Sequence, residues 1–255
     1  MNFELPHFLP NSNLLMACHI TGVHDVNRNI TLEDDNYELV RDWAESVSAL
    51  NLQGIIFHNN FSSATCNKYK NKFIHFIKVN YNPQFNPNVY RYIIYNQFLQ
   101  NYTNHFNGIF VTDVSDVILI NNPFIDQYFI DNPSSIFCGD EPKTLNNDWM
   151  VAHSTHLRNQ ISDFEEYESR FGQEVLLNCG IIGGYAPLFK DFIQKLCIIH
   201  QQANCNNQTA YTGDMGAFNY LVRTQFNEHL KHGTPVNTIF KMYENERTDC
   251  WFRHK

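Results

Sequence analysis

The sequence is poor in charged residues, and the charge that it carries is mostly acidic. Asp, Glu, Lys and Arg make up 17% of its 255 residues, and the formal net charge is −8. A protein that coats nucleic acid needs a basic face, so this balance argues against DNA or RNA as the partner. It leaves room for a small phosphorylated ligand, because one bound metal ion can supply positive charge locally.

Long hydrophobic runs are absent as well. No stretch approaches the roughly 18 consecutive apolar residues that cross a bilayer. Residues 1–13 contain neither the basic segment nor the apolar segment of a signal peptide. We therefore expect a chain without a transmembrane segment that works in the cytoplasm.

Paired cysteines and the common nucleotide-binding motifs are missing too. The seven cysteines are irregularly spaced and form no Cys-x-x-Cys pair, a pattern that predicts buried thiols in a reducing compartment rather than a disulfide scaffold or zinc knuckle. No Gly-x-Gly-x-x-Gly follows the first predicted strand, as a Rossmann oxidoreductase would require, and no P-loop is present. A sugar nucleotidyltransferase has a glycine-rich phosphate loop with Arg and Lys after its first strand. The loop at residues 21–29 does not have this composition.

Apolar and aromatic residues, by contrast, are plentiful. They make up 43% and 15% of the chain, with 21 Phe and 13 Tyr. This is far more apolar and aromatic surface than a disordered chain exposes to solvent. No internal repeat, low-complexity linker or composition break divides the sequence. We predict a single α/β domain over residues 1–255.

The first half of the chain predicts the beginning of a βαβ arrangement. An apolar run over 13–20 predicts a strand, and Asp35 and Glu38 have the spacing of a capping box for a helix over 35–51. Further elements expected here are strands over 54–57 and 73–79, a helix over 89–102 and a strand over 108–112.

The second half is less regular. Strands are expected over 135–138 and 174–184, with a polar loop or helix between them through residue 170, and helices over 187–203 and 214–227. The last twenty residues carry Trp251 and Phe252, so we expect this tail to pack against the domain.

The acidic pair Asp113 and Asp116 is the most informative local feature. Both follow the strand expected over 108–112, and ligands of α/β sheets bind beyond the carboxyl ends of the strands. Asp113 and Ser115 share a face if the chain stays extended, whereas Asp113 and Asp116 converge if it turns. Either arrangement could hold Mn²⁺ or Mg²⁺ through oxygen ligands. The alternative is that Asp116 caps a helix beginning at Val117.

Two further segments contain candidate site residues. Glycines interrupt the apolar strand that contains Asn178 and Gly180, which indicates a bulge or the close approach of another molecule to the backbone. The alternative is a simple strand-to-turn transition. Asp214 opens a predicted helix, where an acid is also favoured by the helix dipole alone.

Three more residues each have two interpretations. Arg91 and Tyr95 lie four apart, so both could reach one ligand, although a solvated Arg beside a core Tyr fits equally well. His254 could be a frayed surface residue, or it could lie against the body if Trp251 and Phe252 anchor the tail.

Taken together, these segments resemble a GT-A-fold glycosyltransferase. FVTDVSDV (110–117) looks like the metal-binding acidic motif, usually Asp-x-Asp. NCGIIGG (178–184) looks like the strand that lines the donor sugar. TGDMGAFN (212–219) is similar to the Asp-Gln-x-x-x-Asn helix start of family 8 and its relatives, in which a C-terminal His commonly completes the metal site.

The resemblance implies a single Rossmann-like GT-A domain with a mostly parallel central sheet flanked by helices. Residues 1–112 would form its nucleotide-binding half and residues 113–255 its metal and acceptor half. The implied enzyme (EC 2.4 type) would move a sugar from a nucleoside diphosphate sugar to a hydroxyl acceptor in glycan biosynthesis. That acceptor would be a glycan, a lipid-linked saccharide or a protein, and a lipid-linked one would place the enzyme at a membrane surface. A non-catalytic carbohydrate- or partner-binding domain on the same fold and a sugar nucleotidyltransferase stay as alternatives.

The resemblance also implies roles for individual residues. Asp113, Asp116 and His254 would bind Mn²⁺ or Mg²⁺, and Asp214 and Asn178 would act at the reacting sugar. The donor-binding residues would be Arg91, Tyr95, Asp113, Ser115 and Gly180.

Two positions depart from the family pattern. Ser115 occupies the place of the second acid, which comes one residue late at Asp116, and Met215 follows Asp214 where Gln is usual.

The similarity to family 8 favours retention of configuration over inversion. An inverting enzyme would need a carboxylate base beside the acceptor, for which Asp140, Glu141 and Asp148 are the candidates.

Overall fold

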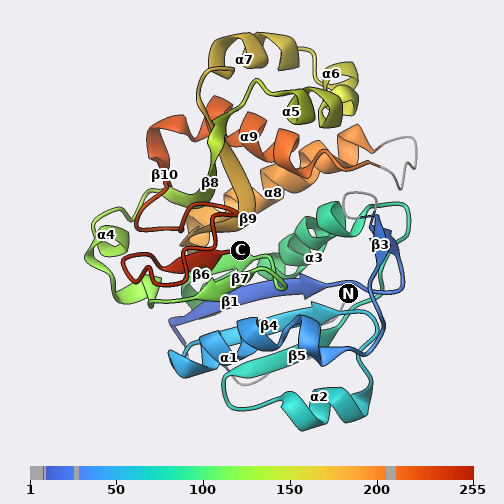
Figure 1. The fold of residues 1–255 in the computed structure, drawn as a ribbon, viewed down its shortest axis with the longest axis vertical. Helices are drawn as coiled ribbons and strands as arrows, with labels where there is room; N and C mark the ends of the chain where they lie inside the picture. Colours follow the sequence, from blue (N-terminus) through green and yellow to red (C-terminus); the bar gives the residue numbers. More distant parts are fainter. Residues whose placement is uncertain (1–7, 9, 26–28, 205–210) are drawn as a thin grey trace.

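The computed structural model describes residues 8, 10–25, 29–204 and 211–255. Residues 1–7, where no leader segment is expected, and Cys205 lie outside the described residues. Figure 1 shows the arrangement of helices and strands in this part of the chain.

A seven-stranded sheet runs through the middle of the molecule in the order β10-β8-β9-β6-β1-β4-β5 (Figure 1). Its strands are β1 (Ser12–His19), β4 (Gln53–His58), β5 (Ile74–Lys78), β6 (Phe106–Thr112), β8 (Ile136–Thr144), β9 (Val175–Tyr185) and β10 (Leu230–His232). Neighbouring strands pair in parallel except at β9, which is antiparallel to both β6 and β8. The predicted mostly parallel sheet of a single α/β domain is confirmed.

The sheet is buried on both faces, which explains why its strands read as apolar runs rather than alternating patterns. In β1, Leu14 and Met16 join the hydrophobic cluster on one face, and Leu15 and Ala17 join the cluster on the other. Helices α3 (Pro87–Tyr102), α8 (Ala186–Ala203) and α9 (Asp214–Gln225) pack in the first cluster, and α1 (Arg41–Ala49) packs in the second.

Shorter elements complete the described chain. They are helices α2 (Ser63–Tyr69), α4 (Gln127–Ile130), α5 (Asp148–His153), α6 (Thr155–Gln160) and α7 (Phe164–Phe171), strands β2 (His24–Asp25), β3 (Ile30–Thr31), β7 (Val117–Leu119) and β11 (Phe252–His254), and 3-10 turns at Tyr37–Leu39, Thr103–His105, Pro123–Ile125 and Asn227–His229.

Two expectations about helix starts are wrong. Asp35 does not cap α1: its backbone has φ of +57°, and its carboxylate accepts a hydrogen bond from the Ser62 backbone N–H at 2.7 Å. The helix begins only at Arg41. Asp116 caps no helix either, because Val117–Leu119 is strand β7, antiparallel to β11.

The tail does pack against the domain, as expected. Trp251 and Phe252 are 1% and 0% exposed and belong to the same hydrophobic cluster as Phe110 and Phe137. The six described cysteines are free thiols. Among the described helices, no one is both long and apolar enough to cross a bilayer.

Candidate functional site

The site lies where β6 ends. Asp113 is the first residue after β6, and its backbone N–H donates to the Gly180 carbonyl of β9 at 2.7 Å. This bond ties the strand-end acid to the glycine-containing strand. Asp116 follows on the short turn into β7.

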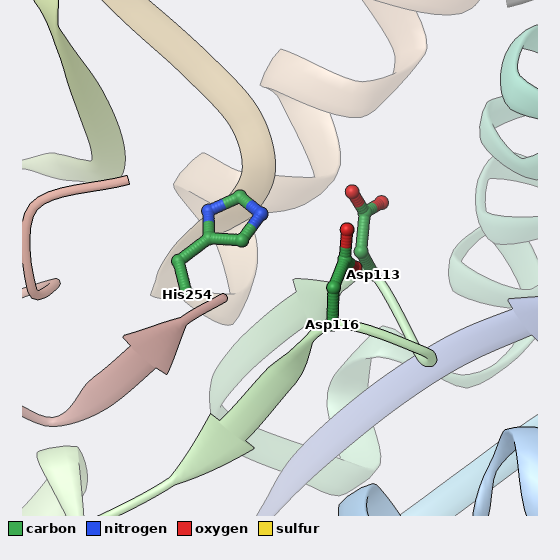
Figure 2. A group of neighbouring side chains, drawn as sticks. All are labelled: Asp113, Asp116 and His254. Atoms are coloured by element: carbon green, nitrogen blue, oxygen red, sulfur yellow. The ribbon is translucent and has the colours of Figure 1, made fainter. Parts of the chain in front are cut away.

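Strand β11 brings His254 to the two aspartates. Because β11 pairs with β7, His254 lies opposite Val117 and is 1% exposed. One ligand atom each from Asp113, Asp116 and His254 lies within 4.8 Å of the others. Figure 2 shows the imidazole on β11 facing the two carboxylates. His254 therefore lies against the body of the domain, and the alternative of a frayed surface residue is wrong.

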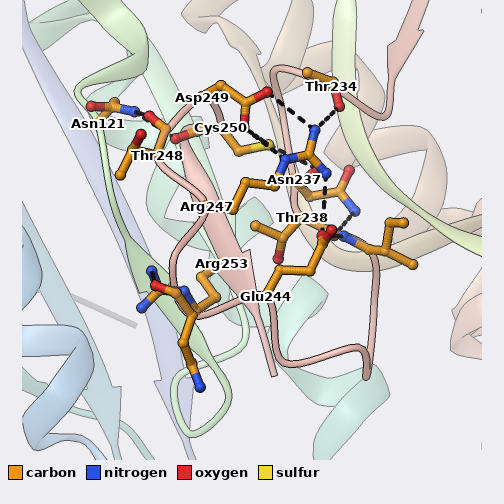
Figure 3. Close-up of polar contacts among 12 residues, drawn as sticks. Asn121, Thr234, Asn237, Thr238, Glu244, Arg247, Thr248, Asp249, Cys250 and Arg253 are labelled. Atoms are coloured by element: carbon orange, nitrogen blue, oxygen red, sulfur yellow. Dashed lines mark hydrogen bonds and ion pairs between the residues drawn. The ribbon is translucent and has the colours of Figure 1, made fainter.

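A polar network holds the segment that leads to His254 (Figure 3). The Arg247 guanidinium donates to Asp249 at 2.7 Å and to Thr234 at 2.5 Å. Asn121 donates to the carbonyls of Thr248 and Cys250, both at 2.7 Å. The Asn121 bonds attach the irregular tail to the turn after β7, and the Arg247 bond to Thr234 attaches it to the segment after β10. The position of His254 therefore depends on more than three strand residues.

The donor set suits a divalent cation. Two carboxylates and one imidazole provide oxygen and nitrogen ligands, and carboxylates are preferred by Mn²⁺ and Mg²⁺. A Cβ on Gly180 would come within 2.7 Å of His254 Cε1 and 2.8 Å of Asp113 Oδ2. The cluster is therefore packed as closely as glycine allows, and these residues fit a bound cation.

Arg91 lies between this cluster and the carboxylate of Asp214. Its guanidinium forms an ion pair with Asp113 and lies 3.5 Å from Asp214 Oδ2. Arg91 is 8% exposed, so its interpretation as a solvated surface residue is wrong. Burial raises the pKa of the Asp214 carboxyl above its ordinary value, and the positive charge of Arg91 opposes that shift.

Asp214 is both a first-turn acid of α9 and a cleft residue. Its Oδ1 atom is buried and has no hydrogen-bond partner within the described part of the chain. Asn219, one turn further along α9, pairs with the N–H and C=O of Leu177 on β9 at 3.0 and 2.9 Å. This two-point contact fixes α9 against the sheet and so positions Asp214.

Asn178 is held on both sides of its amide. Its Oδ1 accepts from the Gly180 N–H at 2.7 Å, and its Nδ2 donates to Glu141 at 2.8 Å. The strand does not end here, because β9 continues to Tyr185, so the strand-to-turn interpretation of the glycines is wrong. Instead, the register against β8 shifts between Cys138, which lies opposite Ile182, and Gly139, which lies opposite Asn178, as in a β-bulge.

Most of the residues identified from the sequence line one cleft of about 310 Å³: Arg91, Asp113, Asp116, Asn178, Gly180, Asp214 and His254. Ser115 does not; it lines a smaller cavity beside Asp113 and Arg91.

Tyr95 is absent from the described lining of both cavities. It is 1% exposed, and its ring contacts Phe57 and Tyr92. A helix face shared with Arg91 does not bring Tyr95 to the cleft, because α3 is buried on nearly every side. Direct contact with a ligand in the cleft is not available to this side chain.

Among the three base candidates, Glu141 lines the cleft. Asp140 Oδ2 lies 2.9 Å from Nδ1 of His232, and Asp148 is an exposed residue at the start of α5. Sequence reasoning missed Trp149 and Phe240, which also line the cleft. Trp149 lies in the first turn of the short helix α5 and Phe240 in an irregular segment, and no spacing pattern identifies either of them.

The fold has a counterpart among solved structures. The galactosyltransferase LgtC, solved in complex with donor and acceptor sugar analogues, matches with a TM-score of 0.50 and 15% identity over 95% of this chain and 86% of that one. Neither a family model nor a curated protein sequence matches the chain. The GT-A fold expected from the sequence is the fold of this protein.

Proposed function

We propose that this protein is a metal-dependent glycosyltransferase that moves a sugar from a nucleoside diphosphate sugar to a hydroxyl acceptor. The convergence of Asp113, Asp116 and His254 at the end of β6 carries the proposal. This cluster borders a cleft large enough for a small molecule, on a fold shared with a galactosyltransferase.

A cation held by Asp113, Asp116 and His254 would neutralise the charge that grows on the diphosphate as the anomeric bond breaks. The remaining cleft residues would bind the sugar. Asp214 Oδ1 is a buried acceptor without a partner among the described residues, so it suits a sugar hydroxyl. The guanidinium of Arg91 would hold Asp113 and Asp214 in position.

Retention of configuration is part of the proposal. Asp214 and Asn178 are the polar groups that could face the sugar opposite the leaving group. NMR of the product's anomeric coupling tests this, and we expect the same anomer as in the donor. The opposite anomer would overturn retention and make Glu141→Gln the variant to test, since Glu141 is the base candidate that lines the cleft.

Nucleotide binding is expected to require a divalent cation. Arg91 is paired with Asp113 and Asp214, so its positive charge is already neutralised by acids. Titration calorimetry with UDP and GDP should show binding with Mn²⁺ and at least a tenfold weaker affinity in EDTA. Tight binding in EDTA would contradict the metal site.

Turnover assays with nucleotide sugars, and with a nucleoside triphosphate plus a sugar phosphate, separate the alternatives. A non-catalytic binding domain would bind the nucleotide with Mn²⁺ but would neither hydrolyse nor transfer the sugar of any nucleotide sugar. A sugar nucleotidyltransferase would instead consume a nucleoside triphosphate together with a sugar phosphate.

Gly180→Ala should remove metal-dependent UDP binding. The new Cβ would lie 2.7–2.9 Å from side-chain atoms of His254, Asp113 and Asn178, so the cluster must spread. We expect about 1–3 kcal/mol of lost folding stability as well. The matched control is Gly139→Ala on neighbouring β8, where a Cβ would meet its nearest atoms at 3.5 Å. Equal affinities for the two variants would show that close packing at Gly180 is unimportant.

A further inference from the structure

A second cavity, of about 300 Å³, is lined by residues of α5, α6 and α7. Figure 1 shows where these three helices lie. Of the described residues, none lines both this cavity and the cleft. Helix α5 separates the two, with Trp149 on the cleft and Met150 on the cavity. The volume is at the lower end of the range for small-molecule sites.

The walls of this cavity are largely apolar. Leu145, Met150 and Phe164 are 5%, 3% and 1% exposed and form its inner part. Val151 also lines it but is 47% exposed, which places it at the opening. An occupant would therefore bury an apolar body against these side chains.

The charged groups of the cavity neutralise each other. Arg158 donates from Nε and Nη2 to the two carboxylate oxygens of Glu168, at 2.7 and 2.5 Å. A third bond joins Arg158 to the Val151 carbonyl at 2.6 Å. An ionic ligand would have to break this two-point ion pair, so the cavity favours an uncharged molecule.

Two side-chain hydroxyls are uncharged polar groups of this cavity. Tyr167 and Ser154 are 3% and 1% exposed, and both line the cavity. Their hydroxyl oxygens are buried and have no hydrogen-bond partner among residues 8, 10–25, 29–204 and 211–255. Burial raises the pKa of Tyr167, so its phenol keeps its proton and can donate. A buried hydroxyl left without a partner is costly, and a ligand oxygen would relieve that cost.

We propose that this cavity is a second binding site, separate from the cleft, for a small uncharged amphiphile. The ligand has an apolar body that packs on Leu145, Met150 and Phe164. It also has a hydroxyl or carbonyl oxygen that accepts a hydrogen bond from Tyr167. This site goes beyond the proposed sugar transfer and does not depend on it.

Methionine methyl NMR can observe the two sites separately. The chain has five Met, of which Met150 lines the cavity and Met215 lines the cleft. With methyl-¹³C methionine, cyclohexylmethanol should shift the Met150 signal and leave Met215 unmoved. Methylcyclohexane, which lacks the oxygen, should bind about fivefold more weakly. Cyclohexanecarboxylate, which is charged, should not bind.

Two variants complete the test. Tyr167→Phe keeps the ring but removes the donor, so it should reduce the preference for the alcohol over the hydrocarbon about fivefold. Val151→Phe should block the opening and weaken both ligands. The proposal is overturned if Met150 stays unmoved up to the solubility limit, if Met215 shifts equally, or if Tyr167→Phe leaves the preference unchanged. UDP with the diamagnetic Mg²⁺ serves as the separate test of the cleft, because it should shift Met215 and not Met150.

Discussion

Asp116→Asn is expected to abolish metal-dependent turnover while the protein stays folded. The substitution keeps the shape of the side chain and removes one charged ligand from the cluster of Asp113, Asp116 and His254. Electrostatic stabilisation by a bound cation is worth several kcal/mol, so turnover should fall at least about 100-fold. Asp116 lies on a turn outside the core, and Tm should stay within about 4 °C.

The control for this variant is Asp191→Asn, the same chemical change at an exposed residue of α8. It should leave turnover and Mn²⁺ dependence unchanged. If Asp116→Asn retains normal Mn²⁺ dependence, the metal site is wrong. A loss of Tm well beyond 4 °C would instead show a structural role for this carboxylate.

Arg91→Met is expected to have the largest effect on stability. The variant keeps the apolar stem but leaves Asp113 and the buried Asp214 without their cation. Breaking a buried ion pair on one side costs about 3 kcal/mol or more, which for a chain of this size lowers Tm by about 6–12 °C. Thermal unfolding of the variant and the unmodified protein measures this decrease in Tm directly.

The pH dependence of this loss has a defined sign. Burial raises the pKa of Asp214 above its ordinary 3.8, and removing Arg91 should raise it further. A carboxyl with a raised native pKa binds its proton more tightly in the folded state. The stability deficit of Arg91→Met should therefore be small below pH 3.8 and grow as pH rises through the native pKa.

A double variant identifies the cause of that loss. Arg91→Met combined with Asp214→Asn removes the stranded buried charge and should recover part of the Tm. Lys195→Met, which breaks an exposed pair with Asp191, is the control and should cost less than about 1 kcal/mol. If Lys195→Met and Arg91→Met cost the same, the buried position of Arg91 has no energetic importance.

The main elements of the fold could be predicted because their signals are local. The β1 and β6 runs are apolar on both faces, and α8 has a buried stripe at helical spacing. Helix α2 was missed because it has no buried residue, so no apolar period marks it. Strand β7 was uncertain because its partner β11 lies at the far end of the sequence, and no local pattern reports such a pairing.

The residues of the candidate site also divide into those with a local sequence signal and those placed by tertiary packing. Asp113 and Asp116 could be identified from a strand end, and His254 from the aromatic residues before it. The failure at Tyr95 is different: spacing on a helix gives a shared face but not the depth to which that face is buried. Trp149 and Phe240 lie in the cleft because of tertiary packing, which no short motif encodes.

The position of His254 on a separate two-stranded sheet has a consequence for local dynamics. The β7–β11 pair lies outside the seven-stranded sheet, but Phe252 of β11 packs on Phe110 of β6 and is bonded through its backbone to Val236 and Thr238. Opening of β11 must therefore break these contacts as well as its pairing with β7. Such an opening would withdraw the imidazole from the two aspartates. Any ligand held jointly by all three residues would oppose the opening. Amide hydrogen exchange at Phe252–His254 is therefore a direct measure of how firmly the site is closed.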